Sequence, residues 1–215
     1  MDRSFNSAIP PHVLNTVQDG VMRTVYRGIP FYKSPFDVIL YLQLLSKQRP
    51  RTVIEIGTKF GGSALWFADM LAVSGVDAPK VISVDITPIA EISDPRILFL
   101  EGDARRLGDV LAAELISDCL RPLLVIEDSS HHCEASLATL EFFHEYLQSD
   151  DYIIVEDGVV AQLPDPVYRK YDDGPNRAVA RFLALHPDQY EIDTGLCDHF
   201  GFNVTYNPNA WLKRL

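Results

Sequence analysis

The chain has 215 residues, of which 47% are apolar and 23% are charged, so it suits one domain with a full hydrophobic core. Its formal charge of −11 argues against a nucleic-acid partner, because neutralising phosphates requires clustered Lys and Arg. No apolar stretch approaches the ~20 residues of a membrane helix, and the N-terminus has no signal peptide pattern, so we expect a cytoplasmic protein without a membrane partner.

The sequence alternates between β-rich and helical segments, which predicts a mostly parallel sheet covered by helices on both faces. The spacing of apolar residues predicts helices over residues 35–47, 63–73, 107–117, 133–147 and 176–186. Short apolar runs predict strands over residues 52–56, 81–85, 97–100, 123–127 and 152–156. Two further strands, at 190–194 and 202–206, are expected to pair antiparallel at the sheet edge. The predicted fold class is α/β and Rossmann-like, with seven strands.

Residues 1–34 precede this pattern and are expected to form an N-terminal arm, with the domain itself spanning residues 35–215. Pro10, Pro11, Gly28 and Pro30 suggest that the arm is extended. Such an arm either covers a site, packs on a second subunit of a homo-oligomer, or lies on the surface as a plain loop. The sequence leaves these alternatives open.

Three cysteines, Cys119, Cys133 and Cys197, are widely spaced and do not form the pattern of a metal knuckle. Free cysteine behaves as a small apolar residue and is among the residue types most often buried. We therefore expect all three to be buried and reduced, without a functional role.

A glycine-rich turn follows the first strand and begins the next helix. Glycine lets the backbone pass close to a ligand and adopt positive φ, and the free N–H groups of a helix start point into the crevice. Candidate cofactor-binding residues are therefore Gly57, Thr58, Gly61 and Ser63, with Ser63 as the expected helix cap. The glycines do not make the strict G-x-G-x-x-G pattern of dinucleotide sites, so a tight turn without a ligand is the alternative.

Acidic residues occur at the ends of the next two strands. Asp85 ends the second strand, and Asp103 lies in the turn after the third. A carboxylate at the second strand end can accept hydrogen bonds from both ribose hydroxyls of a nucleoside, which fits either NAD or S-adenosylmethionine. Glu55, just before the glycine turn, resembles the acidic residue common there in class I methyltransferases and favours S-adenosylmethionine.

Two buried strands each end in Glu-Asp, as Glu127-Asp128 and Glu156-Asp157. Consecutive strands usually pair about 4.8 Å apart, so these carboxylates should crowd together at the ligand-binding end of the sheet. A divalent ion such as Mg²⁺, which takes oxygen ligands at about 2.1 Å, would relieve this crowding. The alternative is that one glutamate turns toward a backbone amide or a helix N-terminus.

A histidine pair follows the first of these strand ends. His131 lies three residues beyond Asp128, within reach of a hydroxyl bound at the predicted metal. Its reference pKa of about 6.5 suits a general base at neutral pH. Paired histidines at a helix start are otherwise often simple polar caps.

These motifs together resemble the cephalosporin hydroxylase/rhamnosyl O-methyltransferase family and its metal-dependent macrolide-sugar O-methyltransferases. The resemblance runs from about residue 30 to the C-terminus and includes segments at 174–183 and 207–214. Its motifs are Gly61-Gly62-Ser63-Ala64, Asp128-Ser129-Ser130-His131 and Val155-Glu156-Asp157.

The resemblance implies a class I methyltransferase fold and O-methylation of a small-molecule hydroxyl, on a sugar, a glycoside or another natural product. It implies that Asp128, Glu156 and Asp157 hold Mg²⁺ and that His131 is the base. By the same resemblance Glu55, Gly57, Asp85 and Asp103 line the S-adenosylmethionine site. Glu127 lies outside the implied metal set, and its role stays open.

Two other functions remain compatible with the residues. One is a nicotinamide-dependent oxidoreductase on the same type of sheet, which the missing dinucleotide glycine pattern disfavours. The other is a protein that binds a nucleoside or a partner without catalysis. The loops expected to shape the acceptor pocket, residues 87–93 and 159–173, contain Tyr168 and Tyr171, which could stack on a sugar ring.

Overall fold

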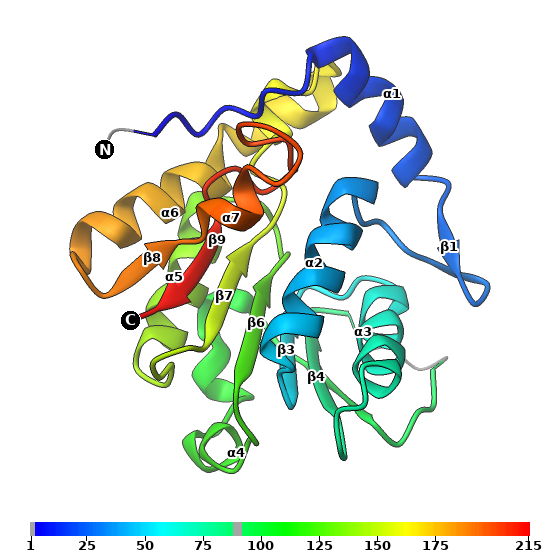
Figure 1. Ribbon diagram of the computed structural model, residues 1–215, viewed down its shortest axis with the longest axis vertical. Coiled ribbons are helices and arrows are strands. Elements are labelled where there is room, and N and C mark those ends of the chain that lie inside the picture. The colour runs from blue at the N-terminus through cyan, green and yellow to red at the C-terminus, as the bar shows by residue number, and fades with distance from the viewer. Residues whose placement is uncertain (1–2, 88–91) are drawn as a thin grey trace.

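The computed structural model describes residues 3–87 and 92–215, and its centre is a seven-stranded sheet (Figure 1). The strand order is β5-β4-β3-β6-β7-β9-β8, and the first five strands run parallel. Short apolar runs form these strands because both faces of a parallel sheet are covered. The strands are β3 (Thr52–Ile56), β4 (Lys80–Asp85), β5 (Ile97–Glu101), β6 (Leu123–Glu127), β7 (Tyr152–Val155), β8 (Tyr190–Ile192) and β9 (Trp211–Arg214).

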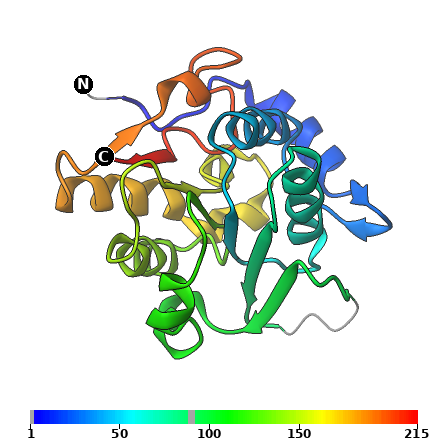
Figure 2. The same ribbon diagram turned by 60° about the horizontal axis from the view of Figure 1, so that its bottom comes forward.

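Helices pack on both faces of this sheet, as Figures 1 and 2 show from two directions. On one face lie α2 (Pro35–Gln48) and α3 (Gly62–Val73), together with the short α7 (Thr194–Cys197). On the other lie α4 (Ala113–Ser117), α5 (Cys133–His144) and α6 (Gly174–Leu185), with the 3₁₀ segment η1 (Ala104–Asp109). Alternate strand residues face opposite layers, so Val53 packs with α2 and α3 while Ile54 packs with α5 and α6. The predicted α/β fold with an antiparallel C-terminal pair is confirmed.

The register of β6 and β7 determines where the acidic strand ends lie. The two strands are parallel neighbours, and Glu127 is paired with Val155. The residues that follow, Asp128 and Glu156-Asp157, therefore leave the sheet side by side at its carboxyl edge. The predicted neighbourhood of the two Glu-Asp ends is confirmed.

The predicted strand at residues 202–206 is wrong. The partner of β8 is β9, which begins at Trp211 and also pairs with β7. Residues 202–206 instead form turns, with Asn203 in the left-handed region at φ 50°. The first two residues of β9 are both fully buried, so this strand lacks the alternation on which the prediction relied.

The N-terminal arm is not simply extended. It contains the helix α1 (Pro11–Val21) and a small hairpin of β1 (Val25–Tyr26) and β2 (Ile29–Pro30). Pro11 occupies the first helical position, where its missing N–H costs nothing. Leu14 packs with Val159, Leu163 and Tyr206, so α1 lies beside the 159–171 segment, as seen in blue and yellow at the top of Figure 1.

Three smaller expectations can be compared with the structure. Ser63 is not the helix cap, because α3 starts one residue earlier and Gly61 takes the cap position with φ 81°. The helix predicted over residues 107–117 is broken into η1 and α4. All three cysteines are free and buried, as expected.

Across residues 3–87 and 92–215 no helix has the length and apolarity needed to cross a membrane.

Asp37, in the first turn of α2, joins that helix to the loop before β9. Its buried carboxylate accepts hydrogen bonds from the Thr205 hydroxyl and from the Tyr206 amide, the latter at 3.0 Å. Burial, opposed in part by the Thr205 hydrogen bond, raises the pKa of Asp37 to about 7. This carboxyl therefore holds a proton in the folded protein at a pH where the unfolded chain has lost it.

This difference predicts a pH-dependent contribution of Asp37 to stability. Its folded pKa is raised, so the contribution is full below about pH 4 and is lost as the pH rises through about 7. Asp37→Asn keeps the shape and cannot titrate. We expect the wild type to lose stability relative to this variant between about pH 5 and about pH 7, by at most about 1.4 kcal/mol per pH unit. Urea unfolding across this pH range measures the difference, and two parallel stability curves would contradict it.

Candidate functional site

A cavity of about 1160 Å³ opens at the carboxyl ends of the parallel strands. Open α/β sheets bind ligands at this edge, where the strand order reverses. The β3–α3 turn, the ends of β4 and β5 and the turn after β6 line one part of the cavity. The other part lies under α1 and the 160–171 segment. One continuous space thus joins the predicted nucleoside site to the predicted acidic site.

Five of the seven candidate cofactor residues line this cavity, namely Gly57, Thr58, Ser63, Asp85 and Asp103. The other two, Glu55 and Gly61, are buried and are not among the described lining residues. The Thr58 hydroxyl is buried without a hydrogen-bond partner among the described residues. An unpartnered hydroxyl in the wall of a cavity is suited to a polar ligand, because burying it unpaired costs free energy.

Gly57 holds the turn after β3 against the turn after β6. Its φ is 96°, and a Cβ at this position would collide with the backbone carbonyl of Asp128. Its N–H also donates to the Val84 carbonyl at 2.7 Å. Only glycine allows this close approach, so this residue couples the geometry of the two halves of the site.

The two half-buried acids in the cavity wall, Asp85 and Asp103, differ in their partners. The carboxylate of Asp85 accepts hydrogen bonds from the backbone amides of Lys59 at 2.7 Å and Thr87 at 2.8 Å, which fixes its orientation. Asp103 accepts hydrogen bonds from the Arg105 side chain, and these lower its pKa to about 2. Asp103 is therefore an ionised acceptor at neutral pH. Residues 88–91 of the predicted acceptor loop lie outside the described residues.

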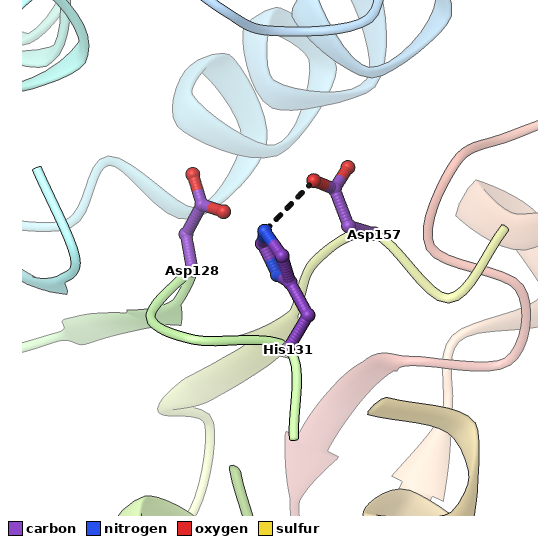
Figure 3. A group of neighbouring side chains, drawn as sticks. All are labelled: Asp128, His131 and Asp157. Carbon is purple, nitrogen blue, oxygen red and sulfur yellow. Dashed lines mark ion pairs between the residues drawn. The ribbon is translucent and has the colours of Figure 1, made fainter. Parts of the chain in front are cut away.

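Asp128, His131 and Asp157 form the centre of the acidic site (Figure 3). Each offers one ligand atom, and these atoms all lie within 4.8 Å of one another. The imidazole lies between the two carboxylates, with its Nε2 3.5 Å from Asp157 Oδ2. Burial lowers the pKa of His131 to about 4, so the ring is neutral at pH 7 and can accept a proton. The two carboxylates offer oxygen ligands that suit a divalent cation.

Glu156 points to a different partner. Its side chain is 5% exposed, and its Oε2 accepts a hydrogen bond from Lys33 Nζ at 2.7 Å. Its Oε1 accepts one from the Tyr41 hydroxyl at 2.5 Å. The same Lys33 ammonium lies 2.6 Å from Asp128 Oδ2. Glu156 is therefore held beside the Asp128–His131–Asp157 group and does not line the cavity among the described residues.

Sequence reasoning did not identify Lys33 or Tyr41. Lys33 stands just before Ser34 and Pro35, in the segment expected to be an extended N-terminal arm, and only 2% of its side chain is exposed. A single lysine near a proline belongs to no apolar periodicity, so the sequence gives no indication that its side chain is buried. Its ion pairs with Asp128 and Glu156 depend on the tertiary structure, in which the arm folds back over the ends of β6 and β7.

The charges in this group are unbalanced. Burial disfavours the Lys33 ammonium, but the attraction of the surrounding carboxylates outweighs it and raises the pKa of Lys33 well above its usual value. Burial also raises the pKa of Asp128, Glu156 and Asp157, and Lys33 offsets only part of this effect. One ammonium is therefore too little positive charge for these acids, and the site favours a further cation.

Glu127 stabilises the turn between β6 and α5 through hydrogen bonds. Its Oε1 accepts hydrogen bonds from the hydroxyls of Ser129 at 2.6 Å and Ser136 at 3.1 Å. The side chain is 1% exposed and lies outside the group that could hold a metal. The open question about this residue is answered by these hydrogen bonds, which tie the turn to the start of α5.

The acceptor side of the cavity has an apolar and aromatic wall. The N-terminal arm contributes Val21 and Met22, and the 160–171 segment contributes Leu163, Tyr168 and Tyr171 among others. Tyr171 packs edge-on against His131, with ring centroids 5.2 Å apart. The predicted loop 159–173 thus lies next to the acidic group. The arm covers this part of the site, which was one of its open alternatives.

The chain is similar to known methyltransferases in sequence. A family model described as rhamnosyl O-methyltransferase/CmcI matches residues 19–215. A rhamnosyl O-methyltransferase of Mycobacterium tuberculosis (strain ATCC 25618 / H37Rv) is 32% identical over 201 residues, covering 89% of this chain and 78% of the relative. The one from Mycobacterium leprae (strain TN) is 33% identical over 204 residues, covering 89% and 83%.

Solved structures share the fold. An apo structure of CmcI matches with a TM-score of 0.68 at 23% identity, covering 90% of this chain and 77% of the other. The apo structure of CalS11, a TDP-rhamnose 3'-O-methyltransferase of calicheamicin biosynthesis, matches with a TM-score of 0.53 at 17% identity, covering 97% and 88%. The predicted class I methyltransferase fold is therefore confirmed.

The close approach at Gly57 predicts the effect of adding one methyl group. Gly57→Ala forces both an unfavourable φ and a collision with the Asp128 backbone, so we expect unfolding free energy to fall by about 2 kcal/mol or more. Gly28→Ala is the matched control, because Gly28 also has positive φ, at 84°, but has open space around it. Denaturant unfolding of both variants measures the difference. Equal losses would show that the collision is absent.

Proposed function

Because this chain belongs to the rhamnosyl O-methyltransferase/CmcI family, we propose that it transfers the methyl group of S-adenosylmethionine to a sugar hydroxyl, with Mg²⁺ or another divalent cation bound at the acidic group. The observation that supports this most directly is the shared cavity. The nucleoside-side residues Gly57 and Asp85 and the group of Asp128, His131 and Asp157 line one space. A methyl donor and an acceptor can therefore meet there without crossing the protein.

The residues fit both groups. For the metal, Asp128 and Asp157 offer oxygen ligands close together, and the surplus negative charge of the site favours a divalent cation. For the cofactor, Asp85 is an oriented acceptor at the end of the second parallel strand, and the Thr58 hydroxyl, which has no partner among the described residues, belongs to the same cavity wall. Negative charge in this space also favours the sulfonium cation of S-adenosylmethionine.

We assign Asp128 and Asp157 as ligands of the metal and His131 as the base. A bound divalent ion supplies positive charge that makes a nearby hydroxyl more acidic. Neutral His131 accepts the hydroxyl proton on Nε2. The acceptor oxygen then forms a bond to the methyl carbon as the carbon–sulfur bond breaks, giving a methyl ether and S-adenosylhomocysteine. Glu156, the third residue of the metal set that the resemblance implies, has both carboxylate oxygens engaged by Lys33 and Tyr41 and is not among the described residues that line the cavity.

The wall of the acceptor side indicates an uncharged acceptor. Val21, Met22, Leu163 and the tyrosines offer apolar surface and ring faces, on which the carbon–hydrogen face of a sugar can stack. The names of the relatives identify rhamnosyl groups as their acceptors, and a rhamnosyl-type sugar is the acceptor we propose here. Self-association and a cytoplasmic location stay predictions from the sequence.

The competing functions have weaker support. A nicotinamide-dependent oxidoreductase needs the tight dinucleotide turn, whereas this turn has only Gly57 and the pair Gly61-Gly62. A protein that only binds a nucleoside has no use for a neutral histidine between two carboxylates in the cavity wall. Titration with S-adenosylhomocysteine and with NAD separates the first alternative from methyl transfer.

Chelation tests the metal. We expect methyl transfer from labelled S-adenosylmethionine to rhamnosides to be lost after EDTA treatment and restored by Mg²⁺. Asp157→Asn should lower the activity at saturating acceptor and raise the Mg²⁺ concentration needed for it. S-adenosylhomocysteine binding, followed by calorimetry, should survive the chelation. Methyl transfer that persists after rigorous metal removal would contradict the metal role.

Substitution of His131 tests the base. His131→Ala should lower kcat about 10²- to 10⁴-fold, the usual contribution of a positioned general base, while S-adenosylhomocysteine still binds. His199→Ala is a control, because His199 is an exposed histidine near the C-terminus and does not line the cavity among the described residues. Single-turnover methyl transfer measures both variants, and an unchanged rate in His131→Ala would remove the histidine from the mechanism.

A further inference from the structure

Lys33 is the one buried lysine within residues 3–87 and 92–215, and it lies inside the acidic site. Its Nζ is 2.6 Å from Asp128 Oδ2 and 2.7 Å from Glu156 Oε2. Asp128 is a proposed ligand of the divalent ion, and Glu156 belongs to the set that the sequence implies. The ammonium therefore occupies an oxygen of Asp128 that a divalent cation would use.

A third carboxylate, that of Glu55, lies next to this lysine and has one oxygen without a hydrogen-bond partner among the described residues. Glu55 Oε1 lies 4.0 Å from Lys33 Nζ, and this oxygen is buried without a hydrogen-bond partner among the described residues. The other oxygen of Glu55 accepts a hydrogen bond from Ser83 at 3.0 Å. Glu55 Oε1 is therefore buried and about 1 Å beyond hydrogen-bonding range of Lys33 Nζ. A small movement of the ammonium would give it Glu55 as an alternative ion-pair partner.

We propose that Lys33 is an internal cation that occupies the acidic site in the metal-free protein, competes with the divalent ion for Asp128, and moves toward Glu55 when the ion binds. Lys33 is a positioning residue in this scheme and does not touch the reacting atoms. The inference rests on the proposed metal site. It adds that the affinity of the site for metal is set by a lysine of the N-terminal arm.

The physical basis is competition between two cations for the same oxygens. In the metal-free protein the ammonium reduces repulsion between buried carboxylates, which stabilises the fold. The same ammonium must give up at least one ion pair before the ion can take the oxygens of Asp128. Removing it should therefore weaken the metal-free protein and strengthen metal binding. A lysine that only fills space would change stability without raising the metal affinity.

Direct metal binding tests this without reference to catalysis. Mn²⁺ serves as the probe, and free Mn²⁺ is measured by electron paramagnetic resonance during titration of the full-length protein. We expect Lys33→Met to bind Mn²⁺ about tenfold or more tightly than the wild type, because a unit charge a few ångströms away is lost from a poorly screened site. Its melting temperature in EDTA should fall, and the rise on adding Mn²⁺ should exceed that of the wild type.

Lys59→Met is the matched control. Lys59 lines the same cavity and carries the same charge, but it is exposed and its ammonium lies over the rings of Tyr32 and Phe60. Its loss should change Mn²⁺ affinity by about threefold or less, because solvent screens its charge. If Lys33→Met tightens Mn²⁺ binding no more than Lys59→Met does, or weakens it, the inference is overturned.

A second pair of variants covers the case in which Lys33→Met does not fold without metal. Glu156→Gln removes one of the repelling carboxylates, and Lys33→Met/Glu156→Gln removes the ion pair as a unit. The double variant should still bind Mn²⁺ more tightly than Glu156→Gln, because Lys33 no longer competes for Asp128. Equal affinity in the two proteins would overturn the inference.

The movement toward Glu55 is tested by a double-mutant cycle. Glu55→Gln should weaken Mn²⁺ binding in the wild type, where the displaced ammonium needs the Glu55 carboxylate, and should weaken it clearly less in Lys33→Met. An equal effect in both backgrounds would overturn the proposed movement. Methyl transfer by the wild type is measured separately, so a protein that methylates normally but fails these binding tests contradicts the inference and leaves the proposed function standing.

Discussion

The structure depends on the crowding of carboxylates at the ends of β6 and β7. Parallel pairing places Asp128 beside Glu156-Asp157, and burial makes each charge costly unless a cation is near. A protein that needed only stability would place apolar residues or amides at these positions. Two acids and a neutral histidine in one place are instead suited to bind a cation. The Lys33 ammonium supplies part of the positive charge that this group needs.

The nucleoside side of the cavity is built on the same sheet edge, so the two halves share their geometry. Gly57 packs directly against the Asp128 carbonyl, and its amide is held by β4. A shift of the glycine turn would therefore move the first acidic turn as well. Transfer between two bound molecules requires their reacting atoms to be held at contact distance. Building both sites from neighbouring strand ends meets this requirement with short, rigid connections.

Much of this arrangement could be predicted from local sequence. The apolar runs of β3 and β6 and the glycine turn are local signals, and parallel pairing of consecutive strands then brings the acidic ends together. The direction of Glu156 could not be predicted, because it depends on Lys33 and Tyr41, which lie more than 100 residues away in sequence. The sequence did not predict strand β9, because its first two residues are both buried and do not alternate with polar residues. It did not predict helix α1, because Pro10 and Pro11 suggest extended chain, whereas Pro11 is the first residue of the helix.

The division into an arm and a domain is useful for reading the sequence but does not describe how the site is built. The segment before α2 supplies Lys33 to the acidic group, and α1 supplies part of the acceptor wall. The connection between them is fixed to the core, since a Cβ at Gly62, at the start of α3, would collide with the backbone carbonyl of Pro30. Charge in the acidic group and the shape of the acceptor space therefore depend on one continuous stretch of chain. A change that displaces this stretch should alter metal binding and acceptor binding together, although its residues lie outside the strands that carry the acids.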